Sequence, residues 1–250
     1  MPGSLVLLRH GQSTWNQLNL FTGWHDVPLS AQGEAEATDA GDVMAGAGLV
    51  FDVAHTSVLS RATMTCHLAL AAMGQVWLPV ERHWKWNERH YGALQGLDKA
   101  QTTIQHGEAQ TRLWRRSFDV APPGIDESSP EHPANDTRYR FVDRSALPAT
   151  ECLRDVVARV VPHFEAVVVP QLRAGMNVLI AAHGNSLRAL VMSLETISQA
   201  DIAELNIPTG VPRLYSMTDD MRVADAQYLG DQVKIRAAIE GVANQARAEH

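Results

Sequence analysis

Short apolar runs alternate with longer stretches of mixed polarity along most of this 250-residue chain. The apolar runs have the length of strands, and the stretches between them carry the caps and stop signals of helices. Because this alternation is typical of βαβ units, we expect an α/β fold with three layers, α/β/α, around a mostly parallel central sheet. The predicted strands cover residues 5–8, 50–54, 76–80, 177–182, 213–217 and, with a weaker pattern, 224–228.

Capping residues place the helices between these strands. Ser30 is the expected N-cap of a helix that stops at Gly46, and Ser198 with Asp201 forms a capping-box pattern that predicts a later helix. A long helix is expected from residue 151, with a bend at Pro162. The other predicted helices cover residues 14–20, 58–73, 99–105, 108–117, 232–245 and a segment from Ser186.

The regular pattern lapses between residues 81 and 148, and the part from 119 to 148 is rich in Pro, Asp, Ser and Asn. Loops of that length inside a compact domain are usually functional or mobile. A chain of 250 residues is near the upper limit for one hydrophobic core. We therefore expect a single domain over residues 1–250, with an insertion at about 81–148.

The composition narrows the choice of partners. The formal net charge of −7 and the pI near 5.8 disfavour nucleic acid and anionic membranes, and no apolar stretch is long enough to span a bilayer. Two isolated cysteines, Cys66 and Cys152, and the lack of a signal peptide indicate a cytoplasmic protein without a zinc site. The histidines do not follow metal-ligand spacing, and there is no P-loop or GxGxxG motif. We expect no metal, nucleic-acid or membrane partner.

Two of the predicted strands end in nearly the same motif. Residues 5–8 run into Arg9-His10-Gly11-Gln12-Ser13, and residues 177–182 run into His183-Gly184-Asn185-Ser186. At the carboxyl edge of an open sheet, neighbouring strands bring such residues into one crevice, beside helix N-termini that favour anions. A lone strand-end histidine is more often a packed core residue. The repeated motif instead favours a phosphate-handling site with two imidazoles.

Charged residues strengthen this interpretation. The neutral imidazole of His10 can attack phosphorus while the Arg9 guanidinium neutralises the phosphoryl oxygens. Arg61 follows the second strand closely enough to reach the same edge, and Glu88 can serve as a proton shuttle for a substrate hydroxyl. Taken alone, each is also typical of an ordinary surface charge. Residues 82–116 hold seven Lys or Arg against three acids, which favours a small polyanion as ligand.

Together these segments resemble the histidine phosphatase superfamily and, more narrowly, the bisphosphoglycerate-dependent phosphoglycerate mutases. The matching runs are LVLLRHGQSTWN, FTGW, TSVLSRA, WNERHYGALQGLDKA, WRRSFD, LPATE, IAAHGNSLRAL and ELNIPTGVP, and YLGD and VANQ extend the likeness toward the C-terminus. RHG marks only the superfamily, whereas residues 87–99 and Trp114-Arg115-Arg116 are far more specific to the mutases.

The resemblance implies a phosphoglycerate mutase-like fold and the interconversion of 3-phosphoglycerate and 2-phosphoglycerate in glycolysis and gluconeogenesis. It makes His10 the phosphorylated nucleophile, Glu88 the general acid/base, His183 a stabiliser of the transferring group, and Arg9 and Arg61 its binders. It implies 2,3-bisphosphoglycerate as primer and intermediate, without a metal, and phosphoglycerates as small-molecule partners, while assembly as a homodimer or homotetramer stays open. The implied substrate-binding residues are Gly11, Gln12, Ser13, Thr14, Trp15, Asn16, Thr22, Gly23, Arg89, His90, Tyr91, Lys99, Arg115, Arg116, Gly184 and Asn185.

This chain departs from the family at three places. Leu20 stands where the family usually has Arg, Cys152 stands where it usually has Ser, and the C-terminal tail at about 240–250 carries less positive charge. The resemblance implies that this tail is mobile and that the insertion helps to cover the site. Leu20 and the tail bear on the balance between mutase and phosphatase activity.

Two alternatives stay open. One is a broader phosphatase of the superfamily, in which water hydrolyses the phosphohistidine of a small phosphorylated metabolite. The other is a non-catalytic module that binds phosphoproteins or phosphometabolites, which would normally lack His10 or Glu88.

Overall fold

The computed structural model describes residues 1–244, and six strands among them form one sheet. The strands are β1 (Leu5–Arg9), β2 (Val53–Thr56), β3 (Val80–Arg82), β4 (Val178–Ala182), β5 (Pro212–Met217) and β6 (Val223–Tyr228). Their order is β3-β2-β4-β1-β5-β6; the first four are parallel, β5 pairs antiparallel with β1, and β6 pairs antiparallel with β5. The predicted α/β fold with a mostly parallel sheet is confirmed.

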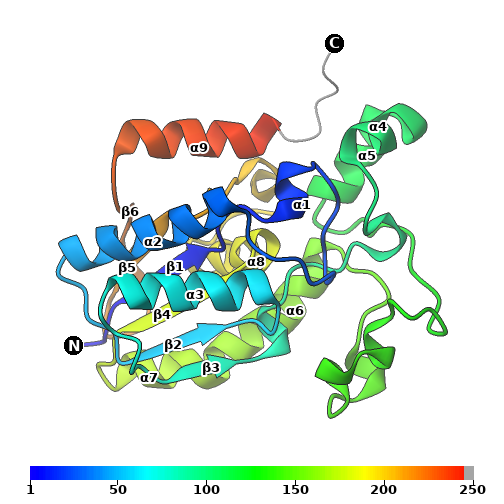
Figure 1. The fold of residues 1–250 in the computed structure, drawn as a ribbon. Coiled ribbons are helices and arrows are strands. Elements are labelled where there is room, and N and C mark those ends of the chain that lie inside the picture. Colours follow the sequence, from blue (N-terminus) through cyan, green and yellow to red (C-terminus); the bar gives the residue numbers. More distant parts are fainter. Residues whose placement is uncertain (245–250) are drawn as a thin grey trace.

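Helices cover both faces of this sheet (Figure 1). α2 (Ala31–Gly46) and α3 (Ser60–Ala72) pack on one face, and α6 (Leu153–His163), α7 (Val169–Arg173) and α8 (Gly184–Leu194) cover the other. Ser30 caps α2 as predicted, because its hydroxyl oxygen accepts a hydrogen bond from the Gly33 amide. The arrangement is the expected three-layer sandwich.

The central strand β1 shows why its residues are apolar without interruption. Leu5 and Leu7 belong to the apolar cluster under α6 and α8, while Val6 and Leu8 belong to the cluster under α2 and α3. Successive strand residues point to opposite faces, so a strand covered on both faces needs an apolar side chain at every position. The run ends at Arg9, where the chain leaves the core and the polar site begins.

Some element boundaries differ from the prediction. β3 starts at Val80 and not at Val76, and the side chains of Val76 and Trp77 are 60% and 69% exposed. The Ser198 pattern opens only a 3-10 turn, Asp201–Glu204, although the Ser198 hydroxyl does accept a hydrogen bond from the Asp201 amide. A capping box fixes where a helix can begin, but Pro208 follows a few residues later and disfavours the helical conformation in the residue before it.

The long helix predicted from residue 151 is interrupted further along than expected. α6 continues through Pro162, and a π turn follows at Phe164–Val168, directly before α7. Pro170 in α7 lacks the N–H that would donate to the carbonyl of Ala166, and a wider turn accommodates that missing hydrogen bond.

The insertion gathers at one end of the molecule, beyond the carboxyl ends of the parallel strands (Figure 1). It contains α4 (Lys99–His106) and α5 (Glu108–Arg116), close to the predicted ranges. Residues 119–148 contain no α-helix or strand, in keeping with their lack of period, and only three short 3-10 helices: Pro133–Asn135, Thr137–Tyr139 and Arg144–Ala146. Tyr139 and Leu147 nevertheless pack with Trp24 in a small apolar cluster that ties this stretch down.

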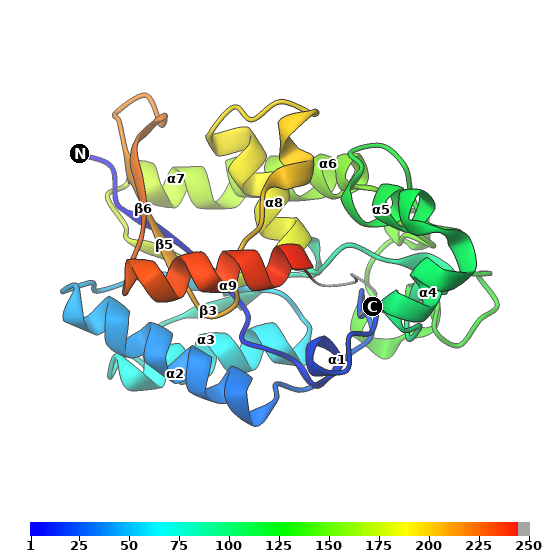
Figure 2. The ribbon, with the colours of Figure 1, turned by 90° about the horizontal axis from the view of Figure 1, so that it is seen from above.

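The remaining helices lie close to the site. α1 (Thr14–Gln17) is shorter than predicted, and α9 (Gln232–Asn244) runs beside α2 toward the insertion (Figure 2). Most of the predicted mobile tail, residues 245–250, lies outside the described residues. Across residues 1–244, every helix is too short or too polar to cross a membrane.

Candidate active site

The two strand-end histidines meet in the structure. β1 and β4 are neighbours, with Arg9 opposite Ala182, so the residues that follow each strand emerge side by side. The rings of His10 and His183 pack edge to face with centroids 5.0 Å apart. Their exposed fractions are 3% and 0%, so both imidazoles are shielded from bulk solvent.

The hydrogen bonding of His10 defines which of its ring nitrogens keeps a free lone pair. Nδ1 lies 2.7 Å from the carbonyl oxygen of Gly11, which can only accept, so Nδ1 carries the proton and Nε2 keeps its lone pair. Burial holds the pKa of His10 well below its usual range, and Arg61 and Arg9 lower it further. The ring is therefore neutral at physiological pH, as a nucleophile must be.

His183 is held from its other side. Its Nε2 lies 2.7 Å from the hydroxyl oxygen of Ser57, and its Nδ1 is buried without a partner within residues 1–244. Burial, followed by Arg61 and His10, lowers the pKa of His183 well below its usual range. The residue stands at the N-terminus of α8, where the helix dipole favours an anion.

Two arginines flank His10. Nη1 of Arg9 donates to the carbonyl of Ile207 at 2.6 Å, and Nη2 of Arg61 donates to that of Gly23 at 2.7 Å. Burial lowers the pKa of Arg61 to about 10, and it lowers the pKa of Arg9 as well. Both remain cationic at neutral pH, and their backbone partners fix the guanidinium groups beside the nucleophile.

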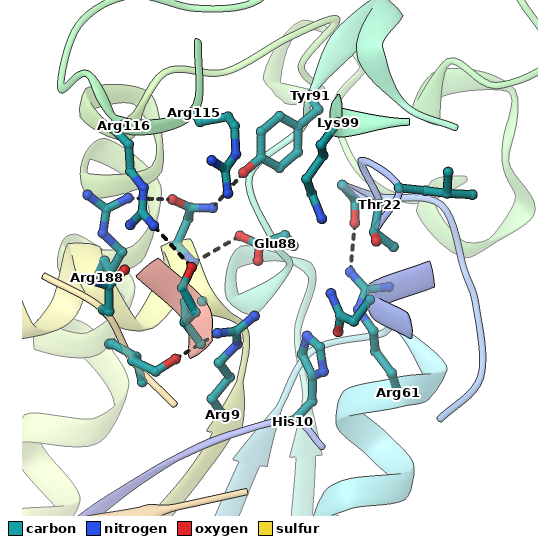
Figure 3. A pocket seen from close by; sticks show the side chains of 18 of the residues that line it. Arg9, His10, Thr22, Arg61, Glu88, Tyr91, Lys99, Arg115, Arg116 and Arg188 are labelled. Atoms are coloured by element: carbon teal, nitrogen blue, oxygen red, sulfur yellow. Dashed lines mark hydrogen bonds between the residues drawn. The ribbon is translucent and has the colours of Figure 1, made fainter. Parts of the chain in front are cut away.

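Glu88 lies between this group and the opposite wall of the pocket (Figure 3). Its Oε1 accepts hydrogen bonds from the amides of Arg89 at 2.7 Å and Asn185 at 3.0 Å. A side chain at Gly184 would contact both Glu88 Oε2 and the Arg9 guanidinium, so a residue without a side chain keeps this wall open. Oε2 accepts neither of these hydrogen bonds, so it could exchange a proton with a ligand.

A second group of cations forms the opposite wall, where Lys99, Arg115 and Arg116 face the pocket (Figure 3). Burial, reinforced by Arg115, lowers the pKa of Lys99 to about 7. Burial likewise lowers the pKa of Arg115 to about 10. Glu88 is the one carboxylate that lines the pocket within the described part of the chain, so the cations there lack countercharge. Such a surplus of buried positive charge suits an anionic ligand.

The cavity brings most of the predicted site residues together. The predicted residues that line it are Arg9, His10, Asn16, Thr22, Gly23, Arg61, Glu88, Tyr91, Lys99, Arg115, Arg116, Gly184 and Asn185. His183 does not line the cavity and instead packs against the ring of His10.

Seven predicted substrate-binding residues do not line the cavity. They are Gly11, Gln12, Ser13, Thr14, Trp15, Arg89 and His90. Ser13 caps α1 by accepting the Asn16 amide, and the Gln12 side-chain oxygen accepts a hydrogen bond from the Ser30 hydroxyl. These residues support the loop that follows β1.

His90 is turned into the interior. It is fully buried, its Nδ1 accepts a hydrogen bond from the Gly92 amide, and burial together with His132 holds its pKa at about 3. A neutral histidine that packs against Trp24 has no contact with the cavity. Arg89 is also fully buried, with its guanidinium 4.4 Å from the centre of the Tyr91 ring. Tyr91 itself lines the pocket, so Arg89 packs against a pocket residue without lining the pocket itself.

The cavity is also lined by residues that were not predicted to bind substrate. They are Leu20, already singled out as a departure from the family, and Arg188, Leu205, Asn206, Ile207 and Val242. Arg188 lies one helical turn beyond Gly184 on α8, and its Nη1 donates to the Asn185 side-chain oxygen at 2.9 Å. That spacing, i to i+4 on one helix face, is the signal that would have identified it. Within residues 1–244 no group of side chains has the composition of a metal site.

Comparison with known proteins fits this geometry. The histidine phosphatase superfamily (branch 1) matches residues 5–135 and 125–225. A mycobacterial glucosyl-3-phosphoglycerate phosphatase is 24% identical with a TM-score of 0.68, over 90% of this chain and 97% of that chain. An alpha-ribazole phosphatase from Shigella flexneri is 21% identical with a TM-score of 0.64, over 88% and 95%. Identities this low establish likeness of fold. The family match spans most of the sequence, and the chain therefore belongs to branch 1 of the histidine phosphatase superfamily.

Proposed function

We propose that this protein transfers phosphoryl groups of small phosphorylated acids through a phosphohistidine at His10, and that its main reaction interconverts 3-phosphoglycerate and 2-phosphoglycerate. One observation carries the proposal: a single nucleophile faces a cavity that has cations at both ends. Arg9 and Arg61 flank His10, and the group that includes Lys99 lies beyond Glu88. A substrate with a phosphate at one end and a carboxylate at the other satisfies both groups.

The residues support a two-step transfer. In priming, Nε2 of His10 attacks one phosphorus of 2,3-bisphosphoglycerate, and the bond between phosphorus and the substrate oxygen breaks. The leaving oxygen takes a proton from Glu88, while Arg9 and Arg61 neutralise the phosphoryl oxygens. In the second step a hydroxyl of the monophosphate gives its proton to the Glu88 carboxylate and attacks the phosphohistidine. When one hydroxyl accepts the phosphoryl group and His10 then takes the phosphoryl group from the other oxygen, the product is the isomer of the substrate.

The second group of cations has a specific task in this scheme. After the second step has formed the bisphosphate, this intermediate must turn inside the pocket without escaping before His10 attacks its other phosphorus. Lys99, Arg115 and Arg116 offer a second anion site that holds whichever end has left His10. A hydrolase that acts once on each substrate has less need of this site.

A phosphatase is the second candidate, and the comparisons favour it. The similar solved structures include proteins named as phosphatases of glucosyl-3-phosphoglycerate and alpha-ribazole phosphate esters. Leu20 adds an uncharged side chain to the pocket at a point where more positive charge would help to retain the intermediate. In this reaction water takes the phosphoryl group from His10, and Glu88 accepts the proton of that water.

One experiment separates the two candidates and tests their common step. The protein is incubated with phosphorus-labelled 2,3-bisphosphoglycerate, and the labelled residue is identified. Coupled assays then follow 2-phosphoglycerate and free phosphate formed from 3-phosphoglycerate. We expect an acid-labile label on His10 that His10→Ala abolishes, and isomer formation faster than phosphate release. Phosphate release as the faster process makes the protein a phosphatase, and a label that survives His10→Ala refutes the phosphohistidine.

The second anion site can be tested by substitution of Arg116, and Arg112 on the same helix, α5, provides a matched control. Arg116 lines the pocket, whereas Arg112 is exposed and pairs with Glu204 at 2.8 Å. Arg116→Gln should lower mutase kcat/KM by about 10–100-fold, since it removes a charged hydrogen bond of roughly 1.5–3 kcal/mol. Arg112→Gln should leave it within about twofold. Equal effects of the two substitutions would count against a second anion site.

A further inference from the structure

The segment that carries Glu88 is held by a buried ion pair outside the pocket. Arg159 of α6 and Glu151 just before it are 8% and 3% exposed. Nε of Arg159 donates to Glu151 Oε1 at 2.6 Å, and Nη2 donates to Oε2 at 2.9 Å, which is a two-point contact. We call this pair the Arg159 bracket.

The remaining N–H groups of the Arg159 guanidinium donate hydrogen bonds to backbone carbonyls around Glu88. Nη1 donates to the carbonyls of Lys85 at 2.6 Å and Asn87 at 3.0 Å, and Nη2 donates to that of Glu88 at 2.9 Å. With the two bonds to Glu151, all five N–H groups of the guanidinium have acceptors. These five hydrogen bonds fix both the position and the plane of the guanidinium group.

The carboxylate of the bracket holds the other side of the same turn. Glu151 Oε2 accepts the amide of His90 at 2.7 Å, and the Glu151 amide donates to the His90 carbonyl at 2.9 Å. Trp24 adds a hydrogen bond from its indole N–H to the Glu88 carbonyl. The main chain is thus fixed immediately before and after Glu88.

This stretch has no regular structure that would fix it otherwise. Trp84–Trp86 is a single 3-10 turn, and Asn87 to His90 belong to no helix or strand. Without the bracket, buried carbonyls would lose their partners and the turn would move to satisfy them. The Glu88 carboxylate would then leave its position beside the Asn185 amide.

We propose that Arg159 and Glu151 are positioning residues for Glu88, so that the Arg159 bracket sets the place from which the proton is exchanged. The inference rests on the proposed role of Glu88 in phosphoryl transfer. It gives the glutamate of the LPATE motif a task in the reaction, although that residue lies outside the cavity. A buried ion pair is by itself weak evidence of stabilisation. The inference depends instead on the hydrogen bonds that Arg159 and Glu151 make to the backbone on both sides of Glu88.

A double-mutant cycle tests the proposal with mutase kcat and KM as readouts. Arg159→Lys keeps the charge but cannot make five planar hydrogen bonds. We expect it to lower kcat by about 10–100-fold, as small misplacements of catalytic groups do, with KM within about threefold. In a Glu88→Gln background the same substitution should change kcat by less than about threefold, because the group that it positions no longer transfers a proton.

Arg213→Lys is the matched control. Arg213 pairs with Glu195 at 2.8 Å and lies outside the cavity, so it should leave kcat within about twofold. If Arg159→Lys fails to fold, Glu151→Gln takes its place in the cycle. Equal loss of kcat in both backgrounds, an unchanged kcat, or a rise in KM as large as the fall in kcat would each overturn the proposal. A fully active Glu88→Gln single variant would instead refute the proposed function, and this inference would fall with it.

Discussion

Lys99 is the cation of this pocket whose charge changes near physiological pH. Burial and the neighbouring Arg115 lower its pKa from 10.5 to about 7, while Asp98 and Glu88 oppose the shift only in part. In the ligand-free protein the ammonium group is therefore charged below pH 7 and mostly neutral above it. An anion bound beside it favours the charged form, so binding takes up a proton when the pH exceeds 7.

We predict that the affinity for 3-phosphoglycerate falls as the pH rises through 7 to 8, by up to about tenfold per pH unit. Calorimetric titrations in buffers of different ionisation enthalpy measure both Kd and proton uptake. Lys99→Arg is the control, since a guanidinium stays charged over this range. The substrate phosphate titrates equally in both proteins, so the difference between them belongs to Lys99. Identical pH profiles would show that Lys99 keeps its charge.

Sequence predicted which candidate residues lie close together better than it predicted their orientation. His10 and His183 were predictable because two strands end in the same motif, and a parallel sheet brings such ends together. His90 was assigned to the substrate because it lies in the same motif as Glu88, yet the turn directs it into the core. A linear motif records which residues occur together and does not record which side of the chain each one faces.

The element next to His10 is α2, whose first turn lies against the loop that follows β1. A Cβ atom at Gly11 would overlap the carbonyl oxygen of Gly33, and one at Gly33 would overlap the carbonyl oxygen of Gln12. The Ser30 cap adds hydrogen bonds to Gln12 across the same contact. The helix can approach the catalytic loop this closely only because both residues lack side chains.

We predict that Gly33→Ala lowers the free energy of unfolding by about 1–3 kcal/mol, as overpacking does, and lowers kcat because the loop after His10 must shift. Gly46, at the other end of α2, has open space around its Cβ position. Gly46→Ala should therefore stabilise the protein by about 0.4–1 kcal/mol without a change in kcat. Urea denaturation and steady-state kinetics of both variants measure this. Equal stabilities of the two variants would contradict the close contact.

Elements were predictable to the extent that local signals determine them. Ser30 and Gly46 mark α2 because caps act within one turn. β3 was misplaced because residues 76 and 77 are as apolar as a strand, although both side chains are exposed and only three later residues pair with β2. Strand pairing depends on a partner far away in the chain, and no local pattern contains it.

At the scale of the whole molecule, the sequence indicated a parallel sheet but not the order of its strands. That order places β4 between β1 and β2, and it is what brings His183 beside His10. The excess of positive charge in the insertion was visible in the sequence, and Lys99, Arg115 and Arg116 do line the cavity. The contacts of Arg159 were not visible, because they join α6 to residues more than 70 positions earlier.

α9 extends from the end of the fold opposite the insertion to the cavity (Figure 2). Its Val242 lines the cavity, and the Val242 carbonyl accepts a long hydrogen bond, 3.5 Å, from Arg116. A cleft lined by Val43 of α2 and Ile235 of α9 lies between the two helices, so their packing against each other is incomplete there. Ile235 is its buried anchor, at 5% exposure, whereas Val233 is 70% exposed.

We predict that Ile235→Ala releases α9 and admits water to the phosphohistidine, which raises the ratio of phosphate release to isomer formation severalfold. The substitution removes buried methyl groups, at a cost of about 2 kcal/mol or more, and that cost falls on the docking of α9 because the sheet does not depend on it. Val233→Ala is the control on the same helix and should leave the ratio unchanged. Both assays are run from 3-phosphoglycerate with the bisphosphate primer in excess. If Ile235→Ala lowers both rates in proportion, α9 contributes to the stability of the site and does not exclude water from it.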